Sequence, residues 1–340
     1  MSERSQPSPT HLLTRQLGCE LGGAVKNGQA VHQGSGAGRQ RVAAVGGEDV
    51  RSGEPTATVK SAVPSPEHGG RTTGVEKNLD FPDLLRLIDE RSTAFRAVVA
   101  AAPDLDAQVP TCPGWTLFDL VKHLGGGDRF WAAIVGAGSA DAPPAEAVAA
   151  RAALEVPRER EALIAWLDAS TQLLLGALRA AGPESGCWTW WPASQSPQTA
   201  GGTARHRVQE TAVHTYDAQL AGGVPQPLPV ELALDGVEEF LFTVCATPSA
   251  WPHKPTAFDF HSVEGRSWRL TVDGDGARIT RIPTPAAATG EDSDVAGASV
   301  HGTASELVLY LYDRIQADSL HVDGDVGLLD LLRAWEPEEK

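Results

Sequence analysis

The sequence predicts two folded parts of different class: a bundle of four helices over residues 79–224 and a small mixed α/β domain over residues 226–337. Three observations predict this layout. Apolar residues recur at helical spacing in four segments of the first part, with no strand pattern between them. The second part alternates apolar and polar residues and contains two Asp-Gly turn signals. Residues 1–77 fit neither class, because they contain no Phe, Trp or Tyr.

The first 77 residues differ from the rest in composition. They hold 13 of the 35 glycines of the chain and no aromatic side chain. A segment so poor in large apolar groups cannot bury enough surface to offset its ordering entropy, so we expect residues 1–77 to be disordered. A dispensable extension is favoured over a regulatory or targeting tail.

The overall composition excludes several classes of protein. The formal net charge of −16 argues against nucleic-acid binding through phosphate neutralisation. No segment approaches the roughly 18 consecutive apolar residues of a membrane helix, so no membrane span is expected. The N-terminus lacks the features of a secretory signal. The four cysteines lie far apart, so we expect no disulfide framework and a reducing, cytoplasmic location. They are Cys19, Cys112, Cys187 and Cys245.

The first two predicted helices have clear boundaries. Pro82 lies near the start of the first, where its missing N–H costs little, and Pro103 ends it. The second helix begins after Thr116, which can form a capping box with Asp119. Three consecutive glycines, at 125–127, lie inside the second helix. They indicate either close helix packing or a ligand that approaches the backbone.

The rest of the predicted bundle is divided by loops. Residues 138–156 read as a loop or a weak helix, and a third helix covers residues 158–181. A loop over residues 184–202 carries three tryptophans. We expect Thr203 to begin the fourth helix, which ends near Gly222.

The C-terminal part is predicted to mix helices and short strands. A helix is expected over 231–245 and a polar loop over 283–294. The other expected elements are strands at 257–261, 267–272, 277–282, 295–301 and 320–322, and helices at 305–312 and 326–335.

Three side chains have the chemistry of a metal site. Glu210 and His214 are four residues apart, so they project from one face of the fourth helix. A third ligand must come from another helix, and His123 is the best candidate. Two histidines and one carboxylate leave a position open, as catalytic zinc sites do. From the spacing alone, an exposed helix pair is the alternative. His206 lies on the same face, four residues before Glu210, and is a fourth ligand, an outer partner of the site or a surface histidine; one of the last two is favoured.

Two stretches of the chain resemble a known family. The first is Thr111-Cys-Pro-Gly-Trp-Thr116, followed by Asp119-Leu-Val and His123-Leu. The second is Trp188-Thr-Trp190, Pro197-Gln-Thr199 and the run Glu210-Thr-Ala-Val-His214 up to Asp217-Ala. Together they closely resemble the mycothiol-dependent maleylpyruvate isomerase family. That family combines a DinB-like, metal-binding four-helix bundle with a domain like sterol carrier proteins. The resemblance covers about residues 79–337.

The resemblance implies a metal site and a thiol cofactor. The residues that match the zinc ligands of the family are His123, Glu210 and His214. The family uses the cysteine thiol of mycothiol, an actinobacterial sugar thiol. In the isomerase the thiolate adds to a conjugated double bond, which then rotates as a single bond before elimination restores it. Relatives use the same thiol for S-transfer.

Four further residues are candidates for binding substrate or thiol. Arg205 or Arg207 could hold a substrate carboxylate through a bidentate pair, although surface arginines are commoner. Trp188 and Trp190 could form a wall of the pocket, with packing between helices as the alternative. The chain departs from the family at Gln209, where many members have histidine.

Three functions remain open from the sequence. The first is a zinc-dependent isomerase or S-transferase that uses mycothiol and a small electrophilic substrate. The second is a hydrolase in which zinc activates water, and the third is a metal-binding regulatory protein without catalysis. We expect a monomer that binds neither nucleic acid nor membrane.

Overall fold

The computed structural model describes residues 78–283 and 295–337. The predicted disorder of residues 1–77 and nearly all of the predicted polar loop at 283–294 lie outside the described residues. None of the described helices combines the length and the apolar character needed to cross a membrane.

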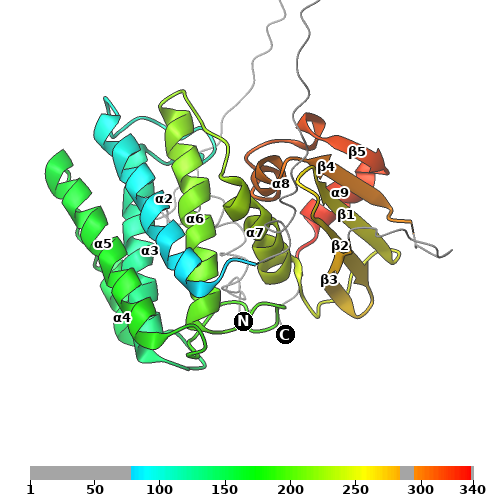
Figure 1. The fold of residues 1–340 in the computed structure, drawn as a ribbon, viewed down its shortest axis with the longest axis horizontal. Helices are drawn as coiled ribbons and strands as arrows, with labels where there is room; N and C mark the ends of the chain where they lie inside the picture. The colour runs from blue at the N-terminus through cyan, green and yellow to red at the C-terminus, as the bar shows by residue number, and fades with distance from the viewer. Residues whose placement is uncertain (1–77, 284–294, 338–340) are drawn as a thin grey trace, which may run out of the picture. The chain divides into compact units, whose positions relative to one another are not determined.

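Four long helices form the first part of the fold, which confirms the predicted bundle (Figure 1). The helices of this part are α2 (Phe81–Ala101), α3 (Leu117–Ala137), α4 (Ala145–Ala152), α5 (Arg160–Ala181) and α6 (Ala200–Ala221). α2 and α3 each pack against both α5 and α6, and the short α4 packs against α3.

The starts of α3 and α6 depend on threonine caps. Thr116 caps α3 through the predicted box, because its hydroxyl accepts from the Asp119 backbone N–H at 3.2 Å. The predicted start of α6 at Thr203 is wrong by about one turn. Thr199 is the cap, and its hydroxyl accepts from the Gly202 N–H at 3.2 Å. Residue 201, in the first turn of α6, is glycine because a Cβ there would lie 2.9 Å from the Pro183 carbonyl oxygen.

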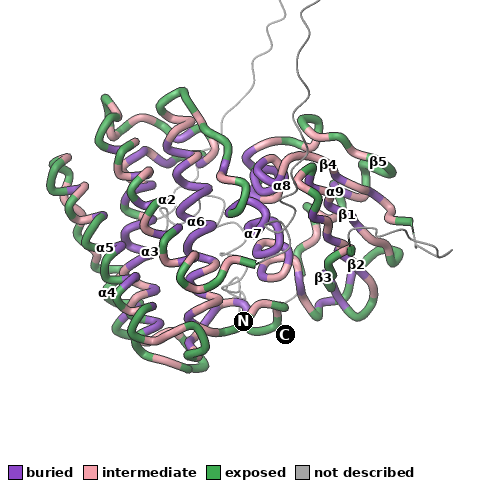
Figure 2. Tube along the Cα trace, in the orientation of Figure 1, coloured by how far each residue is buried: buried purple, intermediate pink, exposed green. Residues whose placement is uncertain are grey.

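α6 is buried on nearly all sides although many of its side chains are polar (Figure 2). The buried polar side chains of α6 that bear on the site are His206, Arg207, Gln209, Glu210, His214 and Asp217. An isolated charge in a protein interior is costly, so each buried charge on this helix needs a partner.

The second part is a five-stranded mixed sheet with helices, as predicted. Its elements are α7 (Val230–Phe240), a π-helical turn η1 (Leu241–Cys245), β1 (Thr256–Ser262), β2 (Ser267–Asp273), β3 (Gly276–Ile282), β4 (Ala298–Gly302), α8 (Ala304–Leu311), a 3₁₀ turn η2 (Ala317–Ser319), β5 (His321–Gly324) and α9 (Val326–Ala334). The strand order is β3-β2-β1-β4-β5. β1 and β4 are parallel, and the other neighbouring pairs are antiparallel.

The two faces of β1 differ in character. Phe258 and Phe260 are buried in the apolar core, whereas Asp259 and His261 alternate with them and lie on the opposite face. The core cluster that contains both phenylalanines also contains Leu174 and Val208 of the bundle. One continuous apolar core therefore joins the helical part to the sheet.

The three glycines of α3 are explained by close packing. A Cβ at Gly125 would lie 2.5 Å from Cη2 of Trp166, and a Cβ at Gly126 would lie 3.0 Å from Leu154. A Cβ at Gly127 would lie 2.9 Å from the Arg207 guanidinium. The glycines thus allow α5, the segment after α4, and a buried arginine of α6 to approach α3.

Gly125→Ala should destabilise the protein, by about 1–3 kcal/mol, because the added methyl group overpacks against Trp166. The control is Gly136→Ala on the same helix, where nothing lies within 4 Å of the new Cβ. That change should stabilise the protein by up to about 1 kcal/mol, because alanine favours the helix. Urea unfolding of the two variants and the parent chain measures both effects. Equal effects of the two substitutions would contradict the packing explanation.

Candidate metal centre

His123, Glu210 and His214 converge inside the bundle. One potential ligand atom of each residue lies within 4.8 Å of the other two. The His123 Nε2 atom is 2.8 Å from Glu210 Oε1, although the two residues are 87 positions apart. The structure thus brings together, from α3 and α6, the three residues predicted as ligands.

Aromatic rings pack around the two histidines. The imidazoles of His123 and His214 lie 5.0 Å apart, edge to face. The Trp115 indole lies 4.9 Å from the His123 ring and 6.5 Å from the His214 ring. Trp115 belongs to the turn that precedes α3, so this turn shields the group from solvent.

The protonation states favour a cation between these side chains. Burial lowers the pKa of His123 to about 4, against the opposing effect of Glu210, so its imidazole is neutral at pH 7. Burial alone would raise the pKa of Glu210, but Arg207 and His123 outweigh it and hold the pKa well below its ordinary value. The group therefore offers a neutral imidazole and a carboxylate, which are the forms that bind metal.

Arg207 supports Glu210 from behind. Its guanidinium is fully buried, pairs with Glu210, and donates to Asp128 Oδ1 at 2.7 Å. Gly127 leaves the space in which this guanidinium lies. Arg207 was predicted to bind a substrate carboxylate, but in this structure two carboxylates of the protein already occupy it.

Arg205 is also paired within the protein. Its Nε atom donates to both carboxylate oxygens of Asp235, at 3.0 and 2.9 Å, and its Nη2 atom donates to Glu238 at 3.1 Å. These contacts join α6 to α7. A role of Arg205 or Arg207 in binding substrate stays a prediction that this geometry does not support.

The tryptophan loop packs around His206. The rings of Trp190 and Trp191 lie 5.6 and 5.1 Å from the His206 ring, and Trp188 stacks on Trp131 at 6.0 Å. His206 is buried, so the surface alternative is wrong for this residue. Its Nδ1 atom lies 3.0 Å from a carboxylate oxygen of Glu239 on α7. Trp188 and Trp190 are only partly buried, and their predicted contact with thiol or substrate is not tested by these contacts.

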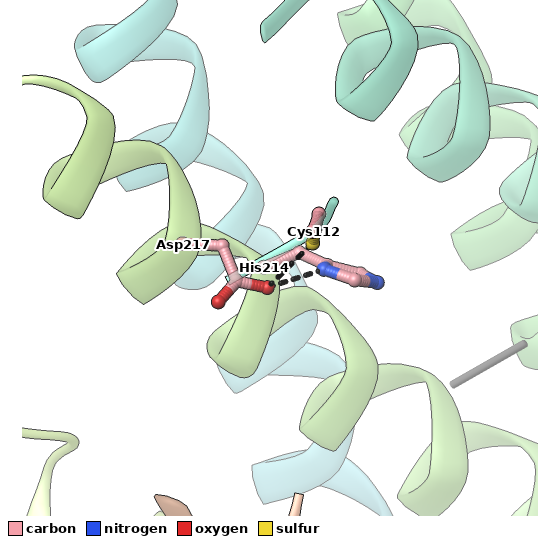
Figure 3. A group of neighbouring side chains, drawn as sticks. All are labelled: Cys112, His214 and Asp217. Carbon is pink, nitrogen blue, oxygen red and sulfur yellow. Dashed lines mark hydrogen bonds and ion pairs between the residues drawn. The ribbon is translucent and has the colours of Figure 1, made fainter. Parts of the chain in front are cut away.

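A second group, Cys112, His214 and Asp217, lies next to the first (Figure 3). The His214 Nδ1 atom is 2.8 Å from Asp217 Oδ2, and Cys112 Sγ is 3.6 Å from the same oxygen. Asp217 Oδ2 contacts both of the other members of this group, and it engages the Nδ1 atom of His214 rather than Nε2. This group is therefore better understood as support for His214.

Asp217 is held by residues that sequence reasoning missed. Arg314 donates to both of its carboxylate oxygens, at 3.0 and 2.7 Å, and Thr111 donates to Oδ1 at 2.6 Å. The three-residue spacing from His214 to Asp217 on one helix was a signal for this pairing. No local pattern points to Arg314, which lies 97 residues further along the chain.

The pairing of Arg205 with α7 leads to a stability prediction. Arg205→Met should destabilise the full chain by about 3 kcal/mol, because it leaves the buried carboxylate of Asp235 without its cation. The control is Arg86→Met, which removes an exposed arginine with acidic partners and should cost less than about 1 kcal/mol. Urea unfolding of both variants measures the difference. A stable Arg205→Met protein would mean that this guanidinium is not structural and is available to a ligand.

The chain was compared with protein-family models and with known proteins. The model described as the mycothiol maleylpyruvate isomerase N-terminal domain matches residues 85–219, and the model described as the MDMPI C-terminal domain matches residues 231–331. A search of curated proteins found no significant match. Two solved structures are similar over 73% of this chain and 95% of theirs. They are the mycothiol-dependent maleylpyruvate isomerase, with 16% identity and a TM-score of 0.44, and a histidine-to-alanine mutant, with 17% and 0.45.

The two family models together cover more than two thirds of the chain, and they match it in the order bundle, then sheet domain. The chain therefore belongs to the mycothiol-dependent maleylpyruvate isomerase family.

Proposed function

We propose that this protein is a zinc-dependent enzyme that uses the thiol of mycothiol to attack a small electrophilic substrate. The attack leads either to cis-trans isomerisation of the substrate or to S-transfer. One observation carries the proposal: two histidines and a glutamate from two helices converge in a buried group. Membership of a mycothiol-dependent isomerase family supports the choice of thiol and of reaction class.

The residues present fit a zinc ion. Two imidazole nitrogens and one carboxylate oxygen are the donor set of catalytic zinc sites. The Nδ1 atom of His214 is engaged by Asp217, which leaves Nε2 as its metal-binding nitrogen. A carboxylate on the far nitrogen of a ligating histidine is the usual outer support of a zinc site.

The surrounding residues would prepare the site for a thiol. A zinc ion bound there would lower the pKa of a coordinated thiol, so that thiolate is present at neutral pH. Arg207 orients the Glu210 carboxylate and balances its charge. The Trp115 indole limits access of water to the two imidazoles, which strengthens electrostatic interactions in the group. The charge of the site is therefore set by the buried guanidinium of Arg207 and the buried carboxylate of Glu210.

The test is metal content and thiol binding of the full chain. Wild-type protein should hold about one zinc ion per chain, and mycothiol should bind only to the zinc-loaded form in calorimetry. Glu210→Gln should weaken zinc binding by at least about 100-fold. Losing an outer partner of a ligand already lowers metal affinity by about 10- to 100-fold, and losing a ligand itself lowers it more. His123→Ala, which leaves the Arg207 pairing intact, should weaken zinc binding as well.

The control for these variants is Glu231→Gln, which changes an exposed carboxylate on α7 and should leave zinc binding unchanged. Zinc binding without thiol binding would favour a hydrolase that activates water. Absence of zinc from the wild-type protein, after zinc is supplied, would overturn the proposal.

A further inference from the structure

We propose that Arg314, which follows α8 in the C-terminal domain, is a positioning residue for the metal ligand His214 and acts through Asp217. This inference rests on the proposed metal site. Arg314 and His214 are 100 positions apart, and nothing in the local sequence connects them. The argument has three steps: the carboxylate between them, the turn that presents Arg314, and the consequence for the imidazole.

Each oxygen of the Asp217 carboxylate has at least two partners, and Cys112 Sγ is a third for Oδ2 at 3.6 Å. Oδ1 accepts from Thr111 Oγ1 at 2.6 Å and from Arg314 Nε at 3.0 Å. Oδ2 accepts from Arg314 Nη2 at 2.7 Å and lies 2.8 Å from His214 Nδ1. The side chains of Arg314 and Asp217 are 1% and 0% exposed. The two parallel contacts of the guanidinium fork fix the plane of the carboxylate, which a single contact would not do.

A sharp turn presents Arg314 to the bundle. The backbone of Asp313 has a φ of +59°, which non-glycine residues rarely adopt. The Arg314 N–H returns to the Leu309 carbonyl at 2.7 Å and closes the end of α8. The Arg314 Nη1 atom donates to the Tyr312 carbonyl at 2.6 Å. The guanidinium is therefore anchored in its own domain while two of its nitrogens reach Asp217.

The consequence for His214 is a fixed tautomer and a fixed ring orientation. Because Asp217 Oδ2 is an acceptor, the hydrogen of His214 is held on Nδ1, and Nε2 keeps its lone pair toward His123 and Glu210. Without Arg314 the carboxylate loses the two contacts that hold its plane. The sheet domain thus takes part in forming a metal ligand of the bundle.

The test compares Arg314→Met and Arg314→Lys in the full chain. In chelator competition, Arg314→Met should bind zinc about 10- to 100-fold more weakly than wild type. Arg314→Lys keeps the charge but not the fork, so its zinc affinity should lie between the two. The control is Arg96→Met, which removes another largely buried arginine that pairs with an aspartate, but away from α6, and should leave zinc affinity unchanged.

A second readout needs no metal. In the metal-free chain, ¹H–¹⁵N NMR of the His214 ring should show the Nδ1–H tautomer in wild type and a mixture in Arg314→Met. If Arg314→Met does not fold, Arg314→Lys supplies both readouts. Wild-type zinc affinity together with an unchanged tautomer in the Arg314 variants would overturn this inference. Failure of wild type to bind zinc would instead refute the proposed function, and the tautomer comparison would still decide the role of Arg314.

A separate observation points to a second metal site, on the polar face of the sheet. His261 on β1 pairs in register with His301 on β4, and His301 pairs in register with His321 on β5. The rings of His261 and His301 stack at 4.6 Å, and those of His301 and His321 lie 5.5 Å apart. We infer that these three histidines form a surface site for a transition-metal ion.

The two carboxylates near these histidines, those of Asp323 and Asp259, have different partners. Asp323 Oδ2 is 3.2 Å from His301 Nε2, and Asp323 Oδ1 is 3.3 Å from His321 Nε2. In the part of the chain that the structure describes, these histidines are the only ion-pair partners of Asp323. Asp259 is instead bound at both oxygens by Arg269, each at 2.7 Å. Asp323 is therefore the carboxylate available to a metal.

The ligand atoms of this group do not all lie within 4.8 Å of one another in this structure, so binding a metal requires side-chain rotation. His321 is 71% exposed, so its imidazole can turn toward His301 without displacing packed side chains. Imidazole nitrogens with one carboxylate bind Cu²⁺ more tightly than Zn²⁺, so the ion expected at this exposed group is Cu²⁺. The site lies on the face of β1 opposite Phe258 and Phe260, so it is separate from the metal centre in the bundle.

The test uses the full-length chain with both His123→Ala and Glu210→Gln, which removes two of the three ligands of the first site. Equilibrium dialysis with Cu²⁺ should show one remaining equivalent of bound metal. Adding His301→Asn and His321→Asn should remove that equivalent. The control, His253→Asn, changes an exposed histidine outside the group and should leave it in place. No remaining equivalent, or one that persists in the double histidine variant, would overturn the second site.

Discussion

The pairing of charged side chains buried along α6 is the constraint on which the rest of the structure depends. An unpaired charge in the protein interior costs roughly several kcal/mol. When one member of a buried ion pair is removed, the other is left as such a charge. Arg207 therefore requires Asp128 on α3, Arg205 requires Asp235 on α7, and Asp217 depends on the guanidinium that follows α8. These contacts lie at different positions along α6 and reach different elements. They fix the position of each element relative to the same helix.

The apolar core and the polar contacts have different roles. One continuous apolar cluster runs from the bundle into the sheet domain and supplies the main driving force for burial. That force is not directional, so it does not by itself set the rotation of α6. Hydrogen-bonded ion pairs are directional, and they specify which face of α6 meets α3. Glu210 and His214 are consequently held toward His123 with little freedom to turn away.

Both the bundle and the sheet domain contribute residues that form or support the candidate metal centre. α3 and α6 supply the three converging side chains, and the turn before α3 supplies Trp115 and Thr111. α7 supplies the carboxylate that meets His206 beside Glu210. Outer partners of this kind tune the affinity of a metal site by orienting its ligands. A bundle without the sheet domain would keep the three side chains but lose part of what orients them.

The sequence by itself determined the features that act within a few residues. Helical periodicity predicted the bundle, the Thr116 box predicted the start of α3, and the four-residue spacing of Glu210 and His214 placed them on one face. Only the tertiary structure decided that α6 begins at Thr199, that its polar face is buried, and that Arg314 reaches the centre. The physical reason is range: caps and spacing are local, whereas burial and ion pairs between residues about 100 positions apart depend on how the elements pack.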